Sequence, residues 1–231
     1  MPFDLIAFDA DDTLWHSEGV FVVSQEMFRS LLQPYLDNGV DLDARLAATE
    51  RRNLAHFGYG VKGFTLSMIE TAIEVTDGRV SAREIGELVE RGKVMMAHPV
   101  ELLDGVAETL TALASRYHLA LISKGDLLHQ EQKLARSGLA ELFDDIEIVS
   151  EKDEATYRRV LQRFGVEPSR FLMVGNSVRS DILPVLAVGG NAVHIPYEHL
   201  WAHEHVEGHV EVPTLPSMRE LPAWLDDERR R

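Results

Sequence analysis

Three carboxylates stand close together near the start of the sequence, at Asp9, Asp11 and Asp12. They follow the apolar run at residues 5–8, which is too short for a helix and is predicted to be a buried strand. Asp favours turns over strands, so these side chains should lie where the strand ends, at the sheet edge where open α/β folds bind ligands. Crowded carboxylates need a bound proton or a cation, and Mg²⁺ prefers oxygen ligands. A solvated acidic turn is the simpler alternative.

Three other predicted strands are also followed by side chains that can bind phosphate or a metal. These are Ser123, Lys124 and Gly125 after the second strand, Lys152 after the third, and Asn176 with Asp181 after the fourth. A hydroxyl, backbone amides and a helix N-terminus can form an anion site, and a lysine can pair with a carboxylate or a phosphate. Each signal alone is also explained by a helix start, a surface lysine or a cap. Together they are stronger, because parallel strands bring these ends to one edge.

The elements that would position these side chains alternate in type from residue 105 onward. Predicted helices span 105–115, 127–137, 154–164 and 180–188, and predicted strands span 118–122, 146–149, 171–174 and 192–195. Such alternation indicates right-handed crossovers and a parallel sheet. Residues 213–225 are predicted to form an irregular tail and a short last helix.

Residues 20–98 have a different pattern, with apolar side chains at helical spacing and no convincing strand. Predicted helices span 21–36, 41–57, 65–75 and 81–96, with a glycine-punctuated loop at 58–63. Ser81 and Glu84 have the spacing of a capping box. The expected organisation is therefore an α/β domain of residues 1–15 and 100–231 and an inserted helical domain of residues 16–99.

The composition limits the classes of partner and chemistry. A chain of 231 residues, 45% hydrophobic and 26% charged, can form one large or two small globular domains. The net charge of −15 disfavours nucleic acid and anionic membrane surfaces as partners. With no cysteine, disulfides, thiolate metal sites and a cysteine nucleophile are excluded, and a cytoplasmic location is the simplest expectation. Neither a signal peptide nor a membrane span is predicted.

The four strand ends, in this order, resemble the motifs of the haloacid dehalogenase superfamily, specifically its phosphatase branch. Residues 8–13 are similar to the first motif, 122–125 to the second, Lys152 to the third and 175–181 to the fourth. The helical insert resembles the family's cap, which lies between the first two motifs. The resemblance implies a Rossmann-like parallel sheet in the order 3-2-1-4-5 with an inserted α-helical cap.

The resemblance also implies a role for each motif residue. Asp9 would attack phosphorus and form an aspartyl-phosphate, Asp11 would be the general acid and base, and Lys152 would stabilise Asp9 and the transferring group. The implied substrate-binding residues are Thr13, Ser123, Lys124 and Gly125. The implied Mg²⁺ ligands are Asp9, Asp11 through its backbone carbonyl, Asn176 and Asp181.

Two positions depart from the family pattern. Asn176 stands where the fourth motif usually has Asp, so an amide oxygen replaces a carboxylate and one negative charge is lost. Lys124 stands where the family often has a neutral residue. A phosphate contact is open for Lys124, but we expect it to face solvent.

The expected function is Mg²⁺-dependent hydrolysis of a small phosphorylated metabolite, of nucleotide or sugar phosphate type, by a monomer or homodimer. One alternative is a carbon–halogen hydrolase, which Asp11 disfavours because the dehalogenases of this superfamily lack an acid at that position. Another is a phosphoryl-binding module with a weakened site, which the acid pair and Lys152 disfavour.

Two further groups of residues are candidates for a functional role. The loop at 57–62 is a candidate for substrate choice, and Arg51, Arg52 and Lys62 could meet a second anionic group or be ordinary exposed cations. A histidine cluster near the C-terminus is interpreted as surface residues, with a zinc site as the less favoured alternative. It comprises His199, His203, His205 and His209.

Overall fold

The computed structural model describes residues 3–36, 39–198, 204 and 210–230. The chain divides into two compact units. Residues 1–18 with 100–231 form one, the core unit, and residues 19–99 form the other, the helical unit. Each unit is described by itself.

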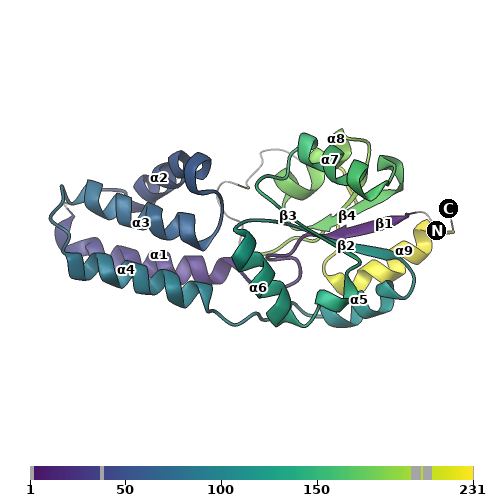
Figure 1. Cartoon of the computed structure of the whole chain (residues 1–231), viewed down its shortest axis with the longest axis horizontal. Helices are drawn as coiled ribbons and strands as arrows, with labels where there is room; N and C mark the ends of the chain where they lie inside the picture. The colour runs from purple at the N-terminus through teal and green to yellow at the C-terminus, as the bar shows by residue number, and fades with distance from the viewer. Residues whose placement is uncertain (1–2, 37–38, 199–203, 205–209, 231) are drawn as a thin grey trace. The chain divides into compact units, whose positions relative to one another are not determined.

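The core unit is built on a five-stranded parallel sheet in the order β3-β2-β1-β4-β5 (Figure 1). The strands are β1 (Leu5–Phe8), β2 (His118–Lys124), β3 (Asp145–Val149), β4 (Phe171–Gly175) and β5 (Asn191–His194). All five lie within two residues of their predicted bounds. The predicted Rossmann-like fold class and strand order are therefore confirmed.

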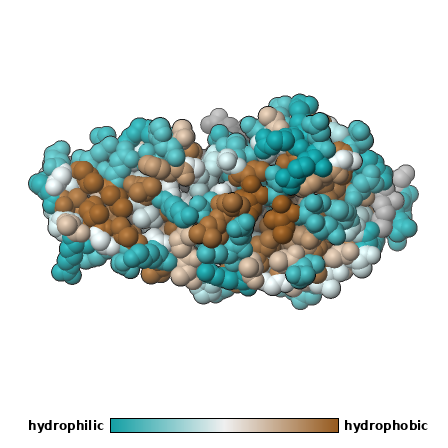
Figure 2. Space-filling view, in the orientation of Figure 1, coloured by the Kyte–Doolittle hydropathy of each residue, from teal (hydrophilic) through white to brown (hydrophobic). Residues whose placement is uncertain are grey.

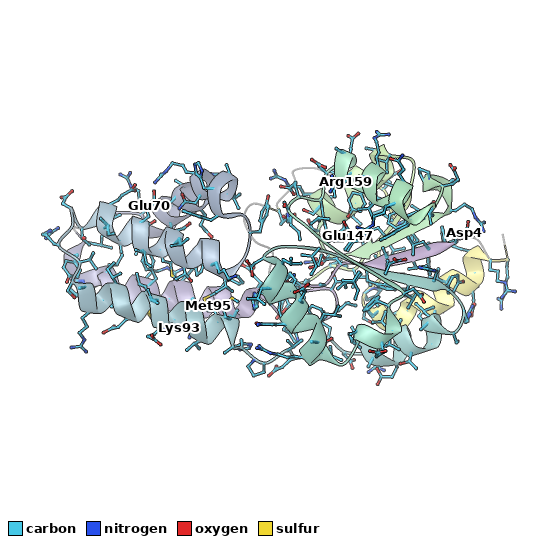
Figure 3. The ribbon with its side chains drawn as sticks, in the orientation of Figure 1. Asp4, Glu70, Lys93, Met95, Glu147 and Arg159 are labelled. Carbon is cyan, nitrogen blue, oxygen red and sulfur yellow. The ribbon has the colours of Figure 1, made fainter. Side chains whose placement is uncertain are left out.

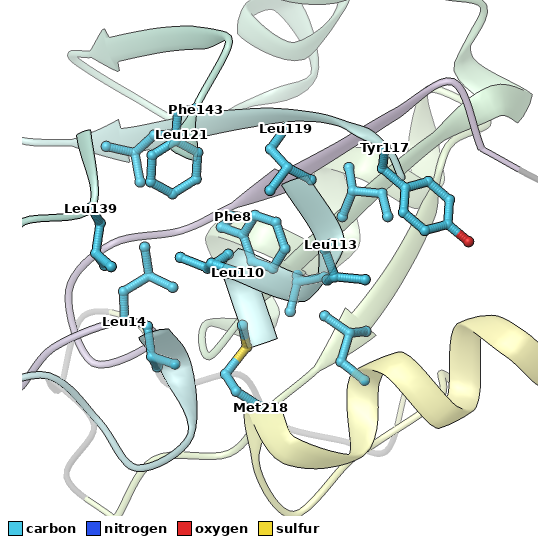
Figure 4. Close-up of a cluster of buried hydrophobic side chains, with 14 of the residues drawn as sticks. Phe8, Leu14, Leu110, Leu113, Tyr117, Leu119, Leu121, Leu139, Phe143 and Met218 are labelled. Carbon is cyan, nitrogen blue, oxygen red and sulfur yellow. The ribbon is translucent and has the colours of Figure 1, made fainter. Parts of the chain in front are cut away.

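Alternate side chains of the sheet enter two separate hydrophobic clusters. Ile6 and Phe8 belong to the cluster shown in Figure 4, whereas Leu5 and Ala7 belong to the other. This follows from strand geometry, because successive side chains point to opposite faces. Both faces are buried by helices, which explains why β1 and β4 are continuous apolar runs.

Helices of the core unit cover both faces of the sheet (Figure 1). They are α5 (Val106–Ala114), α6 (Leu127–Ser137), α7 (Glu154–Phe164), α8 (Leu183–Ala187) and α9 (Leu221–Glu228). Buried side chains of α5, α6 and α9 belong to the cluster that contains Phe8. Buried side chains of α7 and α8 belong to the cluster that contains Leu5. The helix predicted at 180–188 is instead a wide π-helical turn, Val178–Ile182, followed by α8.

The helical unit contains α1 (Glu18–Leu32), α2 (Leu42–Phe57), α3 (Val61–Val75) and α4 (Ala82–Met96). Each helix contributes a buried residue to a common core, respectively Phe28, Leu46, Met68 and Leu88. Helix α4 shows the amphipathic pattern clearly, since Met95 is buried while Lys93 pairs with Glu90 at the surface (Figure 3). The predicted capping box of Ser81 and Glu84 is confirmed at the start of α4.

The loop predicted at residues 58–63 is shorter than expected. Helix α3 begins at Val61, so Gly63 lies inside its first turn. A Cβ atom at Gly63 would lie 2.7 Å from the carbonyl oxygen of Gly58, so this glycine permits close backbone approach. Gly63 is therefore a glycine because of backbone packing, whereas the sequence pattern was interpreted as a turn.

The surface of the helical unit includes exposed hydrophobic side chains. Figure 2 shows them over α3 and α4, where Leu66, Ile73 and Val89 are exposed. None of the helices in the described part of the chain is long and apolar enough to cross a membrane.

Candidate active site

Asp9 lies directly after β1 and is buried at the carboxyl edge of the sheet. Its backbone N–H donates to the carbonyl of Val174 at 2.9 Å, which continues the pairing of β1 with β4 past the end of the strand. Lys152 Nζ donates to Asp9 Oδ1 at 2.5 Å, and Thr13 Oγ1 donates to Asp9 Oδ2 at 3.1 Å. Both oxygens of this carboxylate are therefore held.

Lys152 links the first strand end to the fourth. Its ammonium also donates to Asp181 Oδ1 at 2.7 Å, and the residue is only 3% exposed. A lysine buried to this extent requires anionic partners, because an unpaired buried charge is very unfavourable. Burial alone would lower the pKa of Lys152, but Asp181 and Asp9 raise it above its ordinary value, so the ammonium stays charged.

Asn176 and Asp181 are presented by the turn that follows β4. Asn176 Oδ1 lies 3.2 Å from Thr13 Oγ1, and the Asn176 backbone N–H donates to the same hydroxyl at 3.1 Å. Asp181 Oδ2 accepts from the Ser177 backbone N–H at 3.0 Å. A Cβ atom at Gly175 would lie 2.3 Å from Asp181 Oδ2, so only glycine leaves room for this carboxylate.

Asp11 has partners that the sequence interpretation missed. Its carboxylate accepts from Lys133 Nζ at 2.5 and 2.7 Å, from Trp15 Nε1 at 2.7 Å and from Gln130 Nε2 at 3.0 Å. Gln130 and Lys133 lie on α6 at i, i+3 spacing, on the face that includes the buried Leu134. The sequence did contain a signal for these partners, because Gln130 and Lys133 are long polar side chains on the buried stripe of an amphipathic helix.

Ser123 is the penultimate residue of β2 and is 1% exposed, and its Oγ lies 2.5 Å from Gln130 Nε2. Gly125 follows with a φ of 149°, but its N–H donates to the carbonyl of Val149 at 3.2 Å. That amide is therefore already paired, contrary to the expectation that it would hold phosphate. At the start of α6 the Asp126 side chain accepts from the His129 N–H, so that amide is also paired.

Lys124 does not face solvent, contrary to our expectation. Its ammonium donates to Glu204 Oε1 at 2.6 Å and to Ser180 Oγ at 3.0 Å, and 12% of its side chain is exposed. Glu204 also accepts from Ser180 Oγ at 2.6 Å and from Ser177 Oγ. No pattern in the sequence places Glu204 here. His199, His203, His205 and His209 lie outside the described residues.

The sequence of residues 3–189 matches the family of haloacid dehalogenase-like hydrolases. The chain belongs to this family. The family resemblance expected from the four motifs is thereby confirmed.

Relatives of this hydrolase match it over nearly its full length. A solved haloacid dehalogenase-like hydrolase from Xanthomonas campestris is 45% identical, with a TM-score of 0.88 over 100% of this chain and 95% of that one. The glyceraldehyde 3-phosphate phosphatase of Methanothermobacter thermautotrophicus is 28% identical over 95% of this chain and 98% of its own length. The pyrimidine 5'-nucleotidase YjjG of Escherichia coli is 26% identical over 97% of this chain and 99% of its own length.

The environments of Asp9 and Asp11 shift their pKa values in opposite directions. Burial, with the nearby Asp181 and Asp11 carboxylates, raises the pKa of Asp9 to about 7 despite the attraction of Lys152. Burial would also raise the pKa of Asp11, but the Lys133 ammonium and three side-chain hydrogen bonds lower it below its ordinary value. The hydrolase thus has one carboxyl that gains affinity for protons and one that stays ionised.

The side chains around Asp9 fit a magnesium ion in their chemistry. Among the described residues, no three His, Cys, Asp or Glu side chains are grouped as a metal site. The oxygen donors around Lys152 and Thr13 are instead the carboxylates of Asp9 and Asp181 and the amide oxygen of Asn176. These are all oxygen ligands, which hard cations prefer. Burial and the neighbouring Asp181 and Asp11 carboxylates raise the pKa of Asp9, and a bound cation would offset this crowding of negative charge.

Proposed function

We propose that this hydrolase is a Mg²⁺-dependent phosphatase that acts on a small phosphate monoester of nucleotide or sugar phosphate type. Asp9 would be the nucleophile, and Asp11 the general acid and base. One observation carries the proposal: two carboxylates two residues apart are each held by a separate lysine, Lys152 at Asp9 and Lys133 at Asp11. Two anionic groups with different environments are what a two-step transfer requires. The phosphatase and nucleotidase names of the relatives support the same reaction class.

In the first step, an Asp9 oxygen attacks phosphorus, the bond to the leaving oxygen breaks, and Asp11 gives that oxygen a proton. In the second step, Asp11 takes a proton from water, the water oxygen attacks phosphorus, and the bond to Asp9 breaks. The ionised form of Asp11, which Lys133 favours, is the form needed in the second step. For the first step Asp11 must take up a proton.

The remaining side chains would neutralise charge and orient the phosphoryl group. Lys152 supplies a permanent positive charge beside the attacking oxygen. Ser123 accepts from Gln130 and keeps its hydroxyl proton to donate to a phosphate oxygen. Mg²⁺, held by Asp9, Asn176, Asp181 and the Asp11 carbonyl, would supply the further charge neutralisation that phosphoryl transfer needs.

We also propose that the helical unit is the cap that selects the substrate. Arg52 is paired within that unit with Glu70 and Glu74, so it is a weak candidate for a substrate contact (Figure 3 labels Glu70). Lys62, on the first turn of α3, is exposed and is a second candidate. Kinetics of Lys62→Ala on a panel of phosphate esters tests the cap role, and equal loss on every ester would argue against it.

The function is tested by phosphate release from 4-nitrophenyl phosphate with and without Mg²⁺. We expect turnover with Mg²⁺ only, and loss of turnover in Asp9→Asn because an amide is a poor nucleophile. Asp43→Asn, an exposed change of the same kind on α2, should keep wild-type activity. Turnover retained in a clean Asp9→Asn preparation would overturn the nucleophile assignment. Chloride release from a 2-haloacid without phosphate release would indicate a carbon–halogen hydrolase instead.

A further inference from the structure

We propose that Lys133, Gln130 and Trp15 form a clamp that positions the carboxylate of Asp11 for its steps in the reaction. The inference rests on the proposed role of Asp11 as general acid and base. The three clamp residues would act through Asp11 and not by touching the substrate. They are therefore positioning residues, and none of them belongs to the four motifs from which the site was predicted.

The contacts of the clamp account for both oxygens of Asp11. Oδ1 accepts from Trp15 Nε1 at 2.7 Å and from Lys133 Nζ at 2.5 Å. Oδ2 accepts from Lys133 Nζ at 2.7 Å and from Gln130 Nε2 at 3.0 Å. A carboxylate has about four acceptor directions, so these contacts fix its rotation as well as its place. An acid or base must lie within hydrogen-bond reach of the atom it serves, so this orientation bears directly on rate.

Burial shows that the clamp is part of the folded core unit and not a chance surface contact. Lys133 is 8% exposed, Gln130 is 3% exposed and Trp15 is 1% exposed. Bringing a lysine and a glutamine out of water is unfavourable unless their polar groups are paired, and Asp11 supplies a partner to both. Helix α6, which carries Gln130 and Lys133, is held in place by the Asp126 cap and by packing of Leu134 in the hydrophobic cluster.

The clamp also joins Asp11 to the second motif. Gln130 Nε2 carries two hydrogens and lies 3.0 Å from Asp11 Oδ2 and 2.5 Å from Ser123 Oγ. One amide group therefore sets the distance between the proposed acid and the hydroxyl proposed to bind phosphate. Gly125 leaves space for this side chain, since a Cβ atom there would lie 3.3 Å from Gln130.

The kinetic test compares Lys133→Met with Lys133→Arg and with Lys93→Met, a matched change at an exposed lysine of α4. With Mg²⁺ and 4-nitrophenyl phosphate, we expect Lys133→Met to lower kcat roughly 10- to 100-fold with little change in KM, and Lys133→Arg to recover part of the loss. In an Asp11→Asn background, Lys133→Met should cause little further loss, because its effect passes through Asp11. Wild-type kcat in Lys133→Met, or an equal loss in both backgrounds, would overturn the clamp. If Lys133→Met does not fold, Trp15→Phe, which removes the indole N–H donor to Asp11, is tested in the same two backgrounds with the same expectations.

A second readout needs no turnover. The indole N–H resonance of Trp15 in a ¹⁵N-labelled protein should shift in Lys133→Met and in Asp11→Asn, because both changes disturb the group to which it donates. It should stay in place in Lys93→Met. If the wild-type protein releases no phosphate, the proposed function fails while this resonance still decides the clamp. An unshifted Trp15 resonance in Lys133→Met would overturn the clamp even in an active phosphatase.

Discussion

Lys152 Nζ lies 2.5 Å from Asp9 Oδ1, although 143 residues separate the two in the chain. The same ammonium lies 2.7 Å from Asp181 Oδ1, so one buried cation joins the ends of β1 and β4. A buried ion group of this kind does not by itself prove stability, because desolvation opposes the attraction. Removal of one member has a large effect, because it leaves the other members as buried charges without a partner.

Lys152→Met should destabilise the protein by about 3–5 kcal/mol, because it leaves two buried carboxylates without their cation. The measurement is the free energy of unfolding in urea without Mg²⁺. Addition of Mg²⁺ should restore part of the loss, since a cation at the proposed site replaces the missing charge. Lys93→Met is the matched control, and equal stability of the two variants would contradict the structural role of Lys152.

Asn176→Asp should tighten Mg²⁺ binding by roughly tenfold, which corresponds to about 1.4 kcal/mol. A carboxylate oxygen can keep the contact with Thr13 Oγ1 at 3.2 Å and adds a negative charge to the proposed ligands. The same charge should lower stability without metal, because Asp9 and Asp181 are already crowded. Calorimetric titration of the variant with MgCl₂ checks the first effect. Unchanged affinity would show that Asn176 lies outside the metal site.

Asp12 has a φ of 60° and accepts from the backbone N–H groups of Ser17 at 2.8 Å and Glu18 at 3.2 Å. It thus holds the residues at which α1 begins. Asp12→Asn should stay within about 1 kcal/mol of the wild type, because Asn tolerates this backbone and keeps an acceptor. Asp12→Ala should lose about 1–3 kcal/mol in unfolding experiments, because it loses the acceptor at a strained φ.

Asp77 provides the control for the strain component of that loss. It has a φ of 50° on the exposed turn after α3. Asp77→Ala should therefore report the effect of an alanine at left-handed φ without the lost helix-start contacts. If Asp12→Ala costs no more than Asp77→Ala, the contacts with Ser17 and Glu18 contribute nothing measurable.

The fold could be predicted because its signals are local and regular. Residues 5–8 and 171–174 are continuous apolar runs, as strands buried on both faces must be, and the helices between strands have clear periodicity. The order of the strands came from the family resemblance. The start of α3 was misplaced because Gly63 serves close backbone packing and not a turn. The π-helical turn after β4 has no comparable signal in the sequence.

The proposed site could be predicted only as far as its motifs reach. Asp9, Lys152, Asn176 and Asp181 meet because parallel strands end at one edge, which follows from topology alone. Lys133 could not be found this way, because a lysine on a helix is ordinarily solvated and only tertiary packing turns it inward. The pairing of Glu204 with Lys124 could not be predicted either, because the two residues are far apart in the sequence and only tertiary packing brings them together.

Glu50→Gln should stabilise the protein at alkaline pH but not at acidic pH. Burial raises the pKa of Glu50 from 4.5 to about 7, against the attraction of Arg51. Between these values the folded protein holds a proton that the unfolded chain has lost, so wild-type stability falls as pH rises from about 4.5 to about 7. Gln carries no such penalty, and the gain above pH 7 should be at most about 3 kcal/mol. Urea unfolding at pH 5 and pH 8 measures it, with Glu26→Gln on the exposed face of α1 as the control. A gain of the same size at both pH values would show that packing, and not ionisation of Glu50, is responsible.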